Sequence, residues 1–430
     1  HKTSRTLSEN LPTFKSPWTT KETAAVGTGG ESASGGNKSR GIGKRSVLVV
    51  TGVDSRIPGG RRIRPSSGVG SPIPGGRRQR SPRRTTSIAI NKGGQEHPRA
   101  KAQPEIRMEG PFPLLVHDLG NRTDDCQTRF SISNQAVSTA AIHELKDYRC
   151  FESPQGWVLA LEPASLHTFL WRPQDGQRIS LPSPKQEFPR RCKCLLSDKP
   201  SSTSSCTVLV LDLDQPNLLV CRIGGSQWDS YNYELTMFLA DDKPREIHMA
   251  KLKGIAAVGG KVYYTFTGHA LGVVEFSPEL SLTEFEVDMV ELPDTMPFTS
   301  TYLVESCGDL FMVVVVFLGH NVHKIDKVDV YKMDFSRPEW CKVDRIGDRV
   351  FLLGGDSIGA SNFGASCSAS EHGLSSNCIY FLNNIAAEEN YLHIFNLEKG
   401  TEEVQRPFRH KNGCLLPPPC PPMWLLPTDD

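Results

Sequence analysis

Short apolar runs separated by turn residues recur along the chain from residue 108 onward. They are clearest between Ile346 and Thr401, where runs follow one another at Arg349–Leu353, Cys378–Leu382 and Tyr391–Leu397. Each run has the length of a β-strand, and glycine, asparagine or charged residues bound it. No apolar repeat with helical spacing passes through this stretch. The pattern therefore predicts short consecutive strands of a β-sheet, with a Ser/Gly-rich loop after the first.

The same pattern predicts strands in most of the preceding region. A hairpin is clearest at Phe169–Trp171 and Arg178–Leu181, because Pro173–Gly176 between them has the composition of a β-turn. Thr139–Leu145 is the exception, since its composition suits one or two helical turns. The other predicted strands are Pro113–His117, Thr128–Ile132, Gly156–Ala160, Thr207–Leu213, Asn217–Ile223, Ile255–Val258, Lys261–Phe266, Leu271–Phe276, Thr301–Glu305, Leu310–Leu318, Val328–Met333 and Trp340–Val343.

Glycines that precede apolar strands recur at a spacing that indicates the architecture. Gly260 and Gly308 are 48 residues apart, and Gly308 and Gly347 are 39 apart. Four-stranded propeller blades repeat at about 40–50 residues. No Pro/Gly-rich linker interrupts residues 150–400, as two separate β-sandwiches would need. We therefore expect an all-β fold, a β-propeller of six or seven four-stranded blades over residues 108–430.

Residues 1–107 have a different composition. They contain 21 Lys and Arg but 6 Asp and Glu, whereas the rest of the chain contains 28 and 42. The stretch is rich in Gly, Ser and Arg, and the hexapeptide I-P-G-G-R-R occurs at Ile57–Arg62 and again at Ile73–Arg78. Such a composition cannot bury enough apolar surface to offset chain entropy. We expect a disordered basic extension before an acidic body.

Three interpretations of this extension remain open. It is a nuclear-import signal or nucleic-acid tail, an unstructured extension without a role, or a fragment of a longer product or translated non-coding sequence. Met108 is the first methionine and lies where the strand pattern begins. The negative charge of the body makes broad phosphate contact unfavourable, so we regard nucleic-acid binding as an alternative that depends on the tail alone.

Cysteine usage and apolar run length bear on the cellular environment. The 12 cysteines are scattered without a C-x-x-C pair, which favours reduced thiols in the cytoplasm or nucleus. The longest apolar run, Leu310–Leu318, has nine residues. That is too short for a membrane-spanning helix, so we expect a buried strand and no membrane partner.

One catalytic alternative is a serine hydrolase. Gly355–Gly359 matches G-x-S-x-G and would make Ser357 the nucleophile. His393 or His410 would be the base, and Glu371, Asp429 or Asp430 the acid. The residues after Ser357 lack the helix that such a nucleophile turn requires, so we expect a protein without catalytic activity.

Metal and cofactor sites are not expected either. His320 and His323, Cys192 and Cys194, and Cys414 and Cys420 form close pairs, but each lacks the further ligands of a zinc site. Gly41–Lys44 does not open a helix, as a phosphate-binding loop would.

The stretch I-G-D-R-V-F-L-L-G at Ile346–Gly354, followed by N-C-I-Y-F and by L-E-K-G-T, resembles the C-terminal part of the plant KIB-type β-propeller family, also called domain of unknown function 295. The hairpin with R-P-Q-D-G at Arg172–Gly176 and the ending P-P-M-W-L-L-P are similar to the family too. Members often carry an F-box, a helical module that binds a ubiquitin-ligase adaptor. The resemblance implies a substrate-recognition domain with an unidentified protein partner at a propeller mouth. No F-box pattern occurs in residues 1–107, which puts adaptor binding in doubt.

Overall fold

The computed structural model describes Val47–Gly52 and most of the chain between residues 108 and 428. Within that span the undescribed segments are 109, 118–126, 143–144, 201–205, 239–245, 249–251, 268–269, 277–279, 289–298, 320, 355–362, 384–390 and 409–421. The chain divides into two units, His1–Lys44 and Arg45–Asp430, and all described residues belong to the second. These residues form strands, turns and one short helical turn at Leu145. No helix in this described part is long and apolar enough to cross a membrane.

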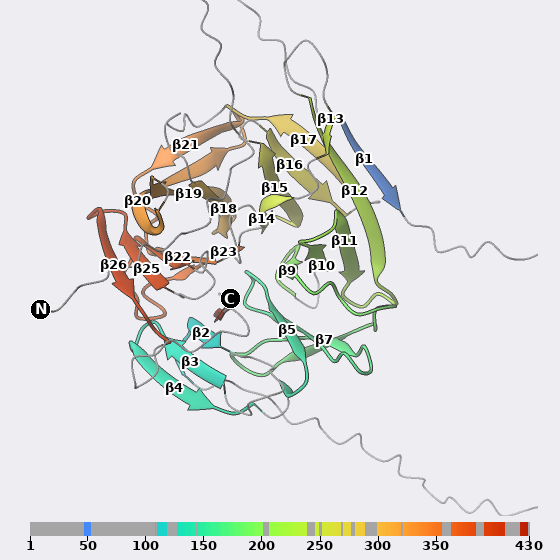
Figure 1. Ribbon diagram of the computed structural model, residues 1–430, viewed down its shortest axis with the longest axis horizontal. Helices are drawn as coiled ribbons and strands as arrows, with labels where there is room; N and C mark the ends of the chain where they lie inside the picture. The colour runs from blue at the N-terminus through green and yellow to red at the C-terminus, as the bar shows by residue number, and fades with distance from the viewer. Residues whose placement is uncertain are drawn as a thin grey trace, which may run out of the picture. The chain divides into compact units, whose positions relative to one another are not determined.

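The strands form six sheets arranged around a ring, and each sheet is one blade of a propeller (Figure 1). Blade 1 contains β27 (Met423–Leu425), β2 (Leu114–His117), β3 (Gln127–Ser131) and β4 (Ala136–Ala140). Blade 2 contains β5 (Arg149–Glu152), β6 (Val158–Leu161), β7 (Thr168–Trp171) and β8 (Arg178–Leu181). Blade 3 contains β9 (Cys192–Leu196), β10 (Thr207–Asp212), β11 (Asn217–Arg222) and β12 (Asp229–Phe238), with β1 (Val47–Gly52) and β13 (Glu246–His248) both paired to β12.

The second half of the chain supplies the other three blades. Blade 4 contains β14 (Lys253–Val258), β15 (Lys261–Thr267), β16 (Ala270–Glu275) and β17 (Ser281–Glu286). Blade 5 contains β18 (Thr299–Ser306), β19 (Asp309–Leu318), β20 (Asn321–Asp334) and β21 (Glu339–Val343). Blade 6 contains, in spatial order, β23 (Phe363–Ser368), β22 (Arg349–Gly354), β24 (Cys378–Asn383), β25 (Tyr391–Asn396) and β26 (Thr401–Gln405). The prediction of a propeller is thus confirmed, with six blades.

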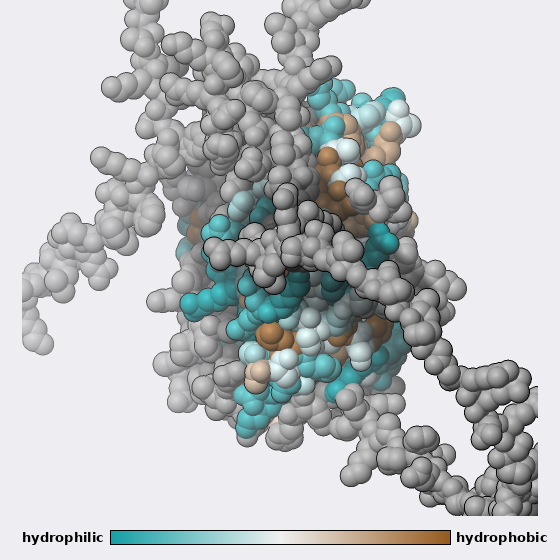
Figure 2. All heavy atoms as spheres, turned by 90° about the vertical axis from the view of Figure 1, so that its right-hand side faces the viewer, coloured by the Kyte–Doolittle hydropathy of each residue, from teal (hydrophilic) through white to brown (hydrophobic). Residues whose placement is uncertain are grey.

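The core of the molecule lies between neighbouring blades. One cluster of buried side chains joins Leu115 and Phe130 of blade 1 to Val350 and Tyr380 of blade 6. Other clusters join blades 2 and 3, blades 3 and 4, and blades 5 and 6 in the same way. Burial of apolar area stabilises a fold by about 25 cal/mol per Å², so each blade depends on its neighbours for its stability. On the side shown in Figure 2, polar and apolar residues are intermingled over the described surface.

The ring is closed by strands from opposite ends of the described body. β27 pairs antiparallel with β2, with Leu425 opposite Leu114. Trp424 in β27 is 1% exposed, and its indole N–H donates to the carbonyl oxygen of Leu353 in blade 6 at 3.2 Å. The closing strand therefore binds both its own blade and the preceding one.

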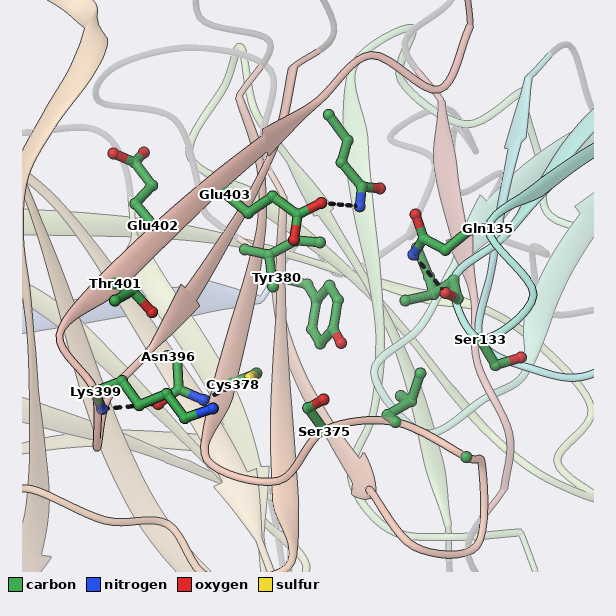
Figure 3. Close-up of a pocket in the computed structure, with 15 residues that line it drawn as sticks. Ser133, Gln135, Ser375, Cys378, Tyr380, Asn396, Lys399, Thr401, Glu402 and Glu403 are labelled. Carbon is green, nitrogen blue, oxygen red and sulfur yellow. Dashed lines mark hydrogen bonds between the residues drawn. The ribbon is translucent and has the colours of Figure 1, made fainter.

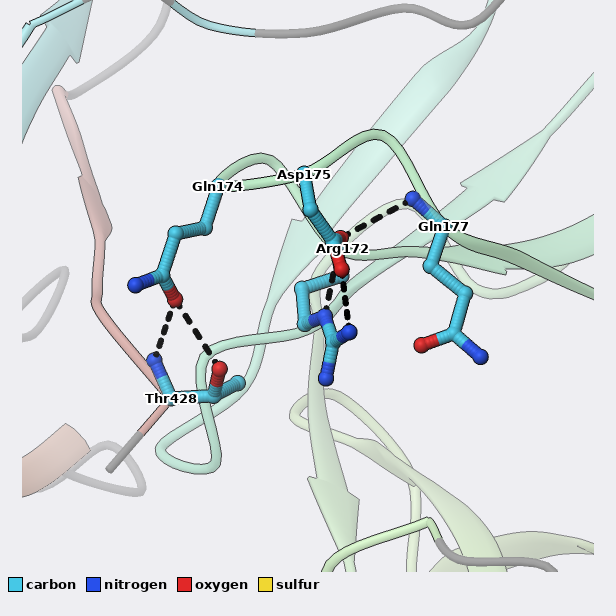
Figure 4. A network of polar contacts seen from close by, with 5 residues as sticks. All are labelled: Arg172, Gln174, Asp175, Gln177 and Thr428. Atoms are coloured by element: carbon cyan, nitrogen blue, oxygen red, sulfur yellow. Dashed lines mark hydrogen bonds and ion pairs between the residues drawn. The ribbon is translucent and has the colours of Figure 1, made fainter. Parts of the chain in front are cut away.

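The chain beyond β27 continues onto blade 2 (Figure 4). Thr428 donates from its backbone N–H and its hydroxyl to the side-chain oxygen of Gln174, at 3.1 and 2.9 Å. Gln174 belongs to the turn between β7 and β8, which Arg172 and Asp175 hold by an ion pair. Gly156 makes room for this path, because a Cβ there would lie 2.8 Å from the carbonyl oxygen of Pro427. The predicted R-P-Q-D-G turn is thus confirmed, and it also anchors the end of the ring closure.

Blade 6 departs from the expected pattern of consecutive strands. The segment predicted as a loop contains β23, which is the end strand of the sheet and lies next to β18 of blade 5. β22 and β24 then pair in parallel rather than as a hairpin. Small residues explain why β23 fits: a Cβ on Gly364 would overlap the backbone of Leu303. The loop prediction was wrong because small and hydroxyl residues here form a closely packed strand.

Two further expectations need comment. The prediction of helical turns over Thr139–Leu145 was wrong at its start, because Thr139 lies in β4 and pairs with Thr128. In residues 1–107, the described part is β1, which pairs with Tyr231–Thr236 of β12. The prediction of a disordered extension did not include this strand, and the rest of that extension lies outside the described residues.

Candidate functional site

A hollow of 430 Å³ lies between blade 6 and blade 1 (Figure 3). One wall consists of residues from β24, β25 and β26, and the other of the turn between β3 and β4. Register explains the first wall, because Tyr380 is opposite Ile394, and Ile394 is opposite Glu403. Residues opposite one another in neighbouring strands point to the same face of the sheet. The three strands thus present one continuous surface to the hollow.

The floor of the hollow is apolar and aromatic. Tyr380 is 5% exposed and Cys378 is 3% exposed, and Ile394 and Leu374 pack against the same cluster. Burial is the main cause that raises the pKa of the Tyr380 phenol far above its ordinary value, and the nearby thiols and Glu403 add to it. Burial also raises the pKa of the Cys378 thiol. Both groups stay protonated at neutral pH and offer a neutral, partly apolar surface.

The rim of the hollow is polar, and its two ends differ in charge. At one end Gln405 donates from its side-chain nitrogen to the carboxylate of Glu403 at 2.7 Å. The side-chain oxygen of Gln405 is buried and has no hydrogen-bond partner within the described part of the chain. At the other end lies Lys399, whose backbone N–H donates to the side-chain oxygen of Asn396 at 2.8 Å. Figure 3 shows Glu403 near the Tyr380 ring and Lys399 beside Asn396.

β26 is the last strand of its sheet, and within the described residues no strand pairs with its outer side. Residues 401–403 and Gln405 line the hollow, and strand alternation puts the side chains of Thr401, Glu403 and Gln405 on the same face as Ile394. On the other face Val404 is 49% exposed. A strand at the edge of a sheet leaves backbone N–H and C=O groups available for another strand. The site therefore combines a side-chain pocket with a backbone edge.

The opposite face of blade 6 carries a histidine–carboxylate pair. His393 is 2% exposed, and its Nδ1 lies 2.6 Å from the carboxylate of Glu402. The next side chains along this face include Tyr391, whose ring lies under the Arg406 guanidinium at 4.4 Å. These contacts join β25 to β26 and to Arg406, the residue after β26. They hold the edge strand β26 in place.

The structure describes two of the predicted hydrolase residues, Glu371 and His393, and does not bring them together. Ser357, His410, Asp429 and Asp430 lie outside the described residues. Glu371 follows the far end of β23, whereas residues 355–362 connect the end of β22 to the start of β23. His393 is opposite Phe381, which is opposite Leu353 near the end of β22. Glu371 and His393 therefore lie toward opposite ends of blade 6. The carboxylate that does contact His393 is Glu402, a residue that the motif-based analysis did not single out.

Of the close histidine and cysteine pairs, the structure describes His323, Cys192 and Cys194. His320, Cys414 and Cys420 lie outside the described residues, and His323 is exposed. Cys192 and Cys194 are free thiols on β9, like the seven other described cysteines. Within the described part of the chain no group of three or more His, Cys, Asp or Glu is arranged to hold a metal ion.

The sequence analysis missed the hollow and its edge strand. A signal for the edge strand was present in the sequence T-E-E-V-Q, which follows the Lys399–Gly400 turn. In a strand of this length, successive side chains point to opposite faces of the sheet. The partner wall was not recoverable, because the β3–β4 turn is more than 200 residues away along the chain. Ring closure alone brings these two segments together.

Comparison with curated proteins gives relatives that are all F-box proteins of one plant. The chain is 30% identical over 133 residues to F-box protein At2g26160 of Arabidopsis thaliana, covering 29% of this chain and 38% of that protein. It is 30% identical over 156 residues to F-box protein At4g35733 of the same plant, covering 34% of this chain and 38% of that protein. The matches thus span about two fifths of the length of these relatives.

Comparison with solved structures gives matches of low similarity. A catalytically inactive virginiamycin B lyase from Staphylococcus aureus has 12% identity and a TM-score of 0.29, over 68% of this chain and 73% of that one. AztD from Citrobacter koseri has 8% identity and a TM-score of 0.26, over 68% of this chain and 93% of that one. Likeness at this level says nothing about function.

The decisive match is to a family profile. The profile of the KIB1-4 beta-propeller matches residues 129–396, which run from β3 of blade 1 to the end of β25 in blade 6. The match thus includes strands of every blade and two of the three strands that form the first wall of the hollow, β24 and β25, whereas β26 follows its end. The matched residues make up more than half of the chain, and this chain belongs to the KIB1-4 β-propeller family.

Proposed function

We propose that this chain is a non-catalytic protein-recognition propeller, similar to the substrate-recognition domain of plant F-box proteins. The observation that carries the proposal is the hollow beside β26, which joins an apolar floor to a polar rim and an open strand edge. Protein-binding sites characteristically place apolar and aromatic side chains at the centre and polar ones around them. The curated relatives are F-box proteins, which supports a role in recruiting another protein. We place this activity in the cytoplasm or nucleus.

Serine hydrolysis through Ser357 is the catalytic alternative. The His393–Glu402 contact supplies a base held by an acid, which such a mechanism uses. The strand that follows residues 355–362 argues against it, because a nucleophile turn leads from a strand into a helix and β23 is a strand. A fluorophosphonate probe distinguishes the two functions: we expect no labelling of Ser357, and stoichiometric labelling there would support the hydrolase.

Partner capture tests the main proposal. The full 430-residue chain, immobilised and exposed to plant extract, is expected to retain a small set of proteins that mass spectrometry identifies. Each retained protein is then purified and titrated against the chain, and saturable binding with one site is the expected result. A chain that is folded by its circular dichroism and its cooperative melt, yet binds none of the retained proteins after purification, would contradict the proposal.

A further inference from the structure

The position of the hollow beside an open sheet edge indicates what kind of partner fits. When an extended peptide adds to a sheet edge, its backbone pairs with the edge strand, and pockets beside the edge receive alternate side chains. β26 has both parts of this arrangement. Its outer side is unpaired in the described structure, and its alternate residues Thr401, Glu403 and Gln405 line the hollow.

Blade 3 shows that an outer edge of this propeller accepts an added strand. β1 comes from a segment more than 170 residues before β12, yet it pairs antiparallel with β12 over six residues. It is the outermost strand of that sheet in the order β1, β12, β11, β10 and β9. The blades are therefore compatible with a strand added from outside the blade's own sequence.

We propose that β26 and the adjoining hollow bind an extended basic segment of a partner protein, which adds to blade 6 as a further strand. The inference rests on the proposed function, because it names the segment that a recognition propeller would bind. It also commits to a backbone-paired segment in which basic and apolar residues alternate.

Hydrogen-bonding capacity favours a basic side chain in the hollow. The Glu403 carboxylate and the side-chain oxygen of Gln405 are both acceptors, and the latter is buried without a partner in the described structure. A buried acceptor without a donor costs free energy, which a ligand N–H would recover. A lysine ammonium or an arginine guanidinium can donate to both acceptors.

The remaining charges orient the segment. Lys399 lies at the turn that begins β26, so the basic ligand residue must lie toward the Gln405 end of the strand. On the other face of β26, Val404 is exposed and Glu402 is already bound to His393. The ligand residues adjacent to the basic one therefore meet the exposed Val404 side chain, next to the Arg406 guanidinium that lies over the Tyr391 ring and disfavours a second cation there. This explains why basic and apolar residues should alternate.

Charged residues on an edge strand also have a protective role, because they discourage pairing with other strands. That role alone would give no binding of a basic peptide. The two interpretations therefore differ in a direct measurement on the full chain.

The first experiment uses the fluorescein-labelled peptide Thr-Val-Lys-Val-Lys-Val-Thr and a matched peptide with glutamate in place of lysine. We expect the 430-residue chain to bind the lysine peptide and to prefer it over the glutamate peptide by fluorescence polarisation. Glu403→Lys should weaken binding of the lysine peptide by about tenfold and improve binding of the glutamate peptide. Glu286→Lys, the same charge change on the exposed outer strand β17 of blade 4, should leave both affinities unchanged.

The second experiment tests the backbone pairing. Two versions of the lysine peptide carry N-methyl groups at alternate backbone nitrogens, one version for each edge of the peptide strand. Only one version can place its unmethylated edge against β26, so we expect one to bind and the other to fail. Equal affinities for the two versions, or no effect of Glu403→Lys on either peptide, would overturn the proposal.

Failure of this inference is distinguishable from failure of the proposed function. Partners purified after capture are titrated against both the unaltered chain and the Glu403→Lys variant. If both chains bind a purified partner equally, recognition stands and the β26 site is wrong. If neither chain binds any purified partner, the proposed function itself fails.

Discussion

Single residues in this propeller are tightly constrained where a large side chain lies across a neighbouring strand of the same sheet, and Gly272 in β16 is a clear case. It lies opposite Tyr264 in β15, and a Cβ added to Gly272 would overlap the tyrosine ring. Tyr264 is fully buried, so its ring has no free space into which it can move. The glycine is needed here for space, since its φ is not in the left-handed region.

We expect Gly272→Ala to lower the free energy of unfolding by about 2 kcal/mol, as overpacking of a core does. Chemical denaturation of the purified chain measures this loss. In a Tyr264→Phe background the ring remains, so the loss should persist, whereas Tyr264→Leu should relieve it. A Gly272→Ala chain as stable as the unaltered one would show that the strands separate easily at this point.

Asp329 in β20 makes stability depend on pH. Burial alone would raise the pKa of its carboxyl, but hydrogen bonds and charges from Lys327 and Lys342 outweigh burial and hold the pKa below its ordinary value. Both ammonium groups lie 2.8 Å from its oxygens. A carboxyl whose pKa is lowered by folding stabilises the fold above its unfolded pKa of about 3.9, and this contribution disappears as the pH falls through the folded pKa.

Asp329→Asn should therefore lower the free energy of unfolding by about 1–2 kcal/mol at pH 7. The difference from the unaltered chain should shrink below about pH 4, because the aspartate then becomes neutral as well. Asp326→Asn, an exposed position on the same strand, serves as the control and should have little effect at either pH. A difference that stays constant from pH 7 to pH 3 would contradict this electrostatic account.

At the scale of elements, ring closure depends on one short strand, β27. Trp424 fills the space between blades 1 and 6 and bonds to the backbone of Leu353. Trp424→Ala should lower the free energy of unfolding by about 4 kcal/mol, because it removes a buried aromatic side chain and leaves a cavity. Trp424→Phe keeps most of the volume and loses the hydrogen bond, so a loss of about 1 kcal/mol is expected. Thermal melts of the two variants test this order, and equal melting temperatures would show that closure does not depend on Trp424.

Elements were predictable from sequence where their apolar residues are large. β22, β24 and β25 were all expected within one residue of their observed bounds, because runs such as F-L-L and I-Y-F need burial. β23 was missed because its residues, F-G-A-S-C-S, are small and polar enough to suggest a loop. Small residues are needed in β23 because it packs closely against β18. The local sequence does not reveal that β18 lies there. The hollow was missed for the same reason, since one of its walls comes from the other end of the ring.

At the scale of the whole molecule, the propeller is a different structure from the F-box for which the relatives are named. The described residues form strands throughout the six blades, and the apolar faces of those strands are buried between neighbouring blades. An F-box instead presents helices with apolar residues at i, i+3, i+4 and i+7 to its adaptor. Residues 1–107 contain no such run, and their longest apolar cluster, Val47–Val50, lies in the strand β1. The blades cannot substitute for these helices without exposing their own core.

We therefore expect the 430-residue chain not to bind the ubiquitin-ligase adaptor that F-box proteins bind. Size-exclusion chromatography of the purified chain mixed with the adaptor should give two separate peaks. Fusion of an F-box before His1 serves as the positive control, because the added helices should produce a stoichiometric complex while the propeller stays folded. Co-elution of the unfused chain with the adaptor would mean that residues 1–107 form a docking helix on contact with it. Separate elution, with the chain still binding its own partner, would leave target recognition and ligase recruitment as separate properties of the molecule.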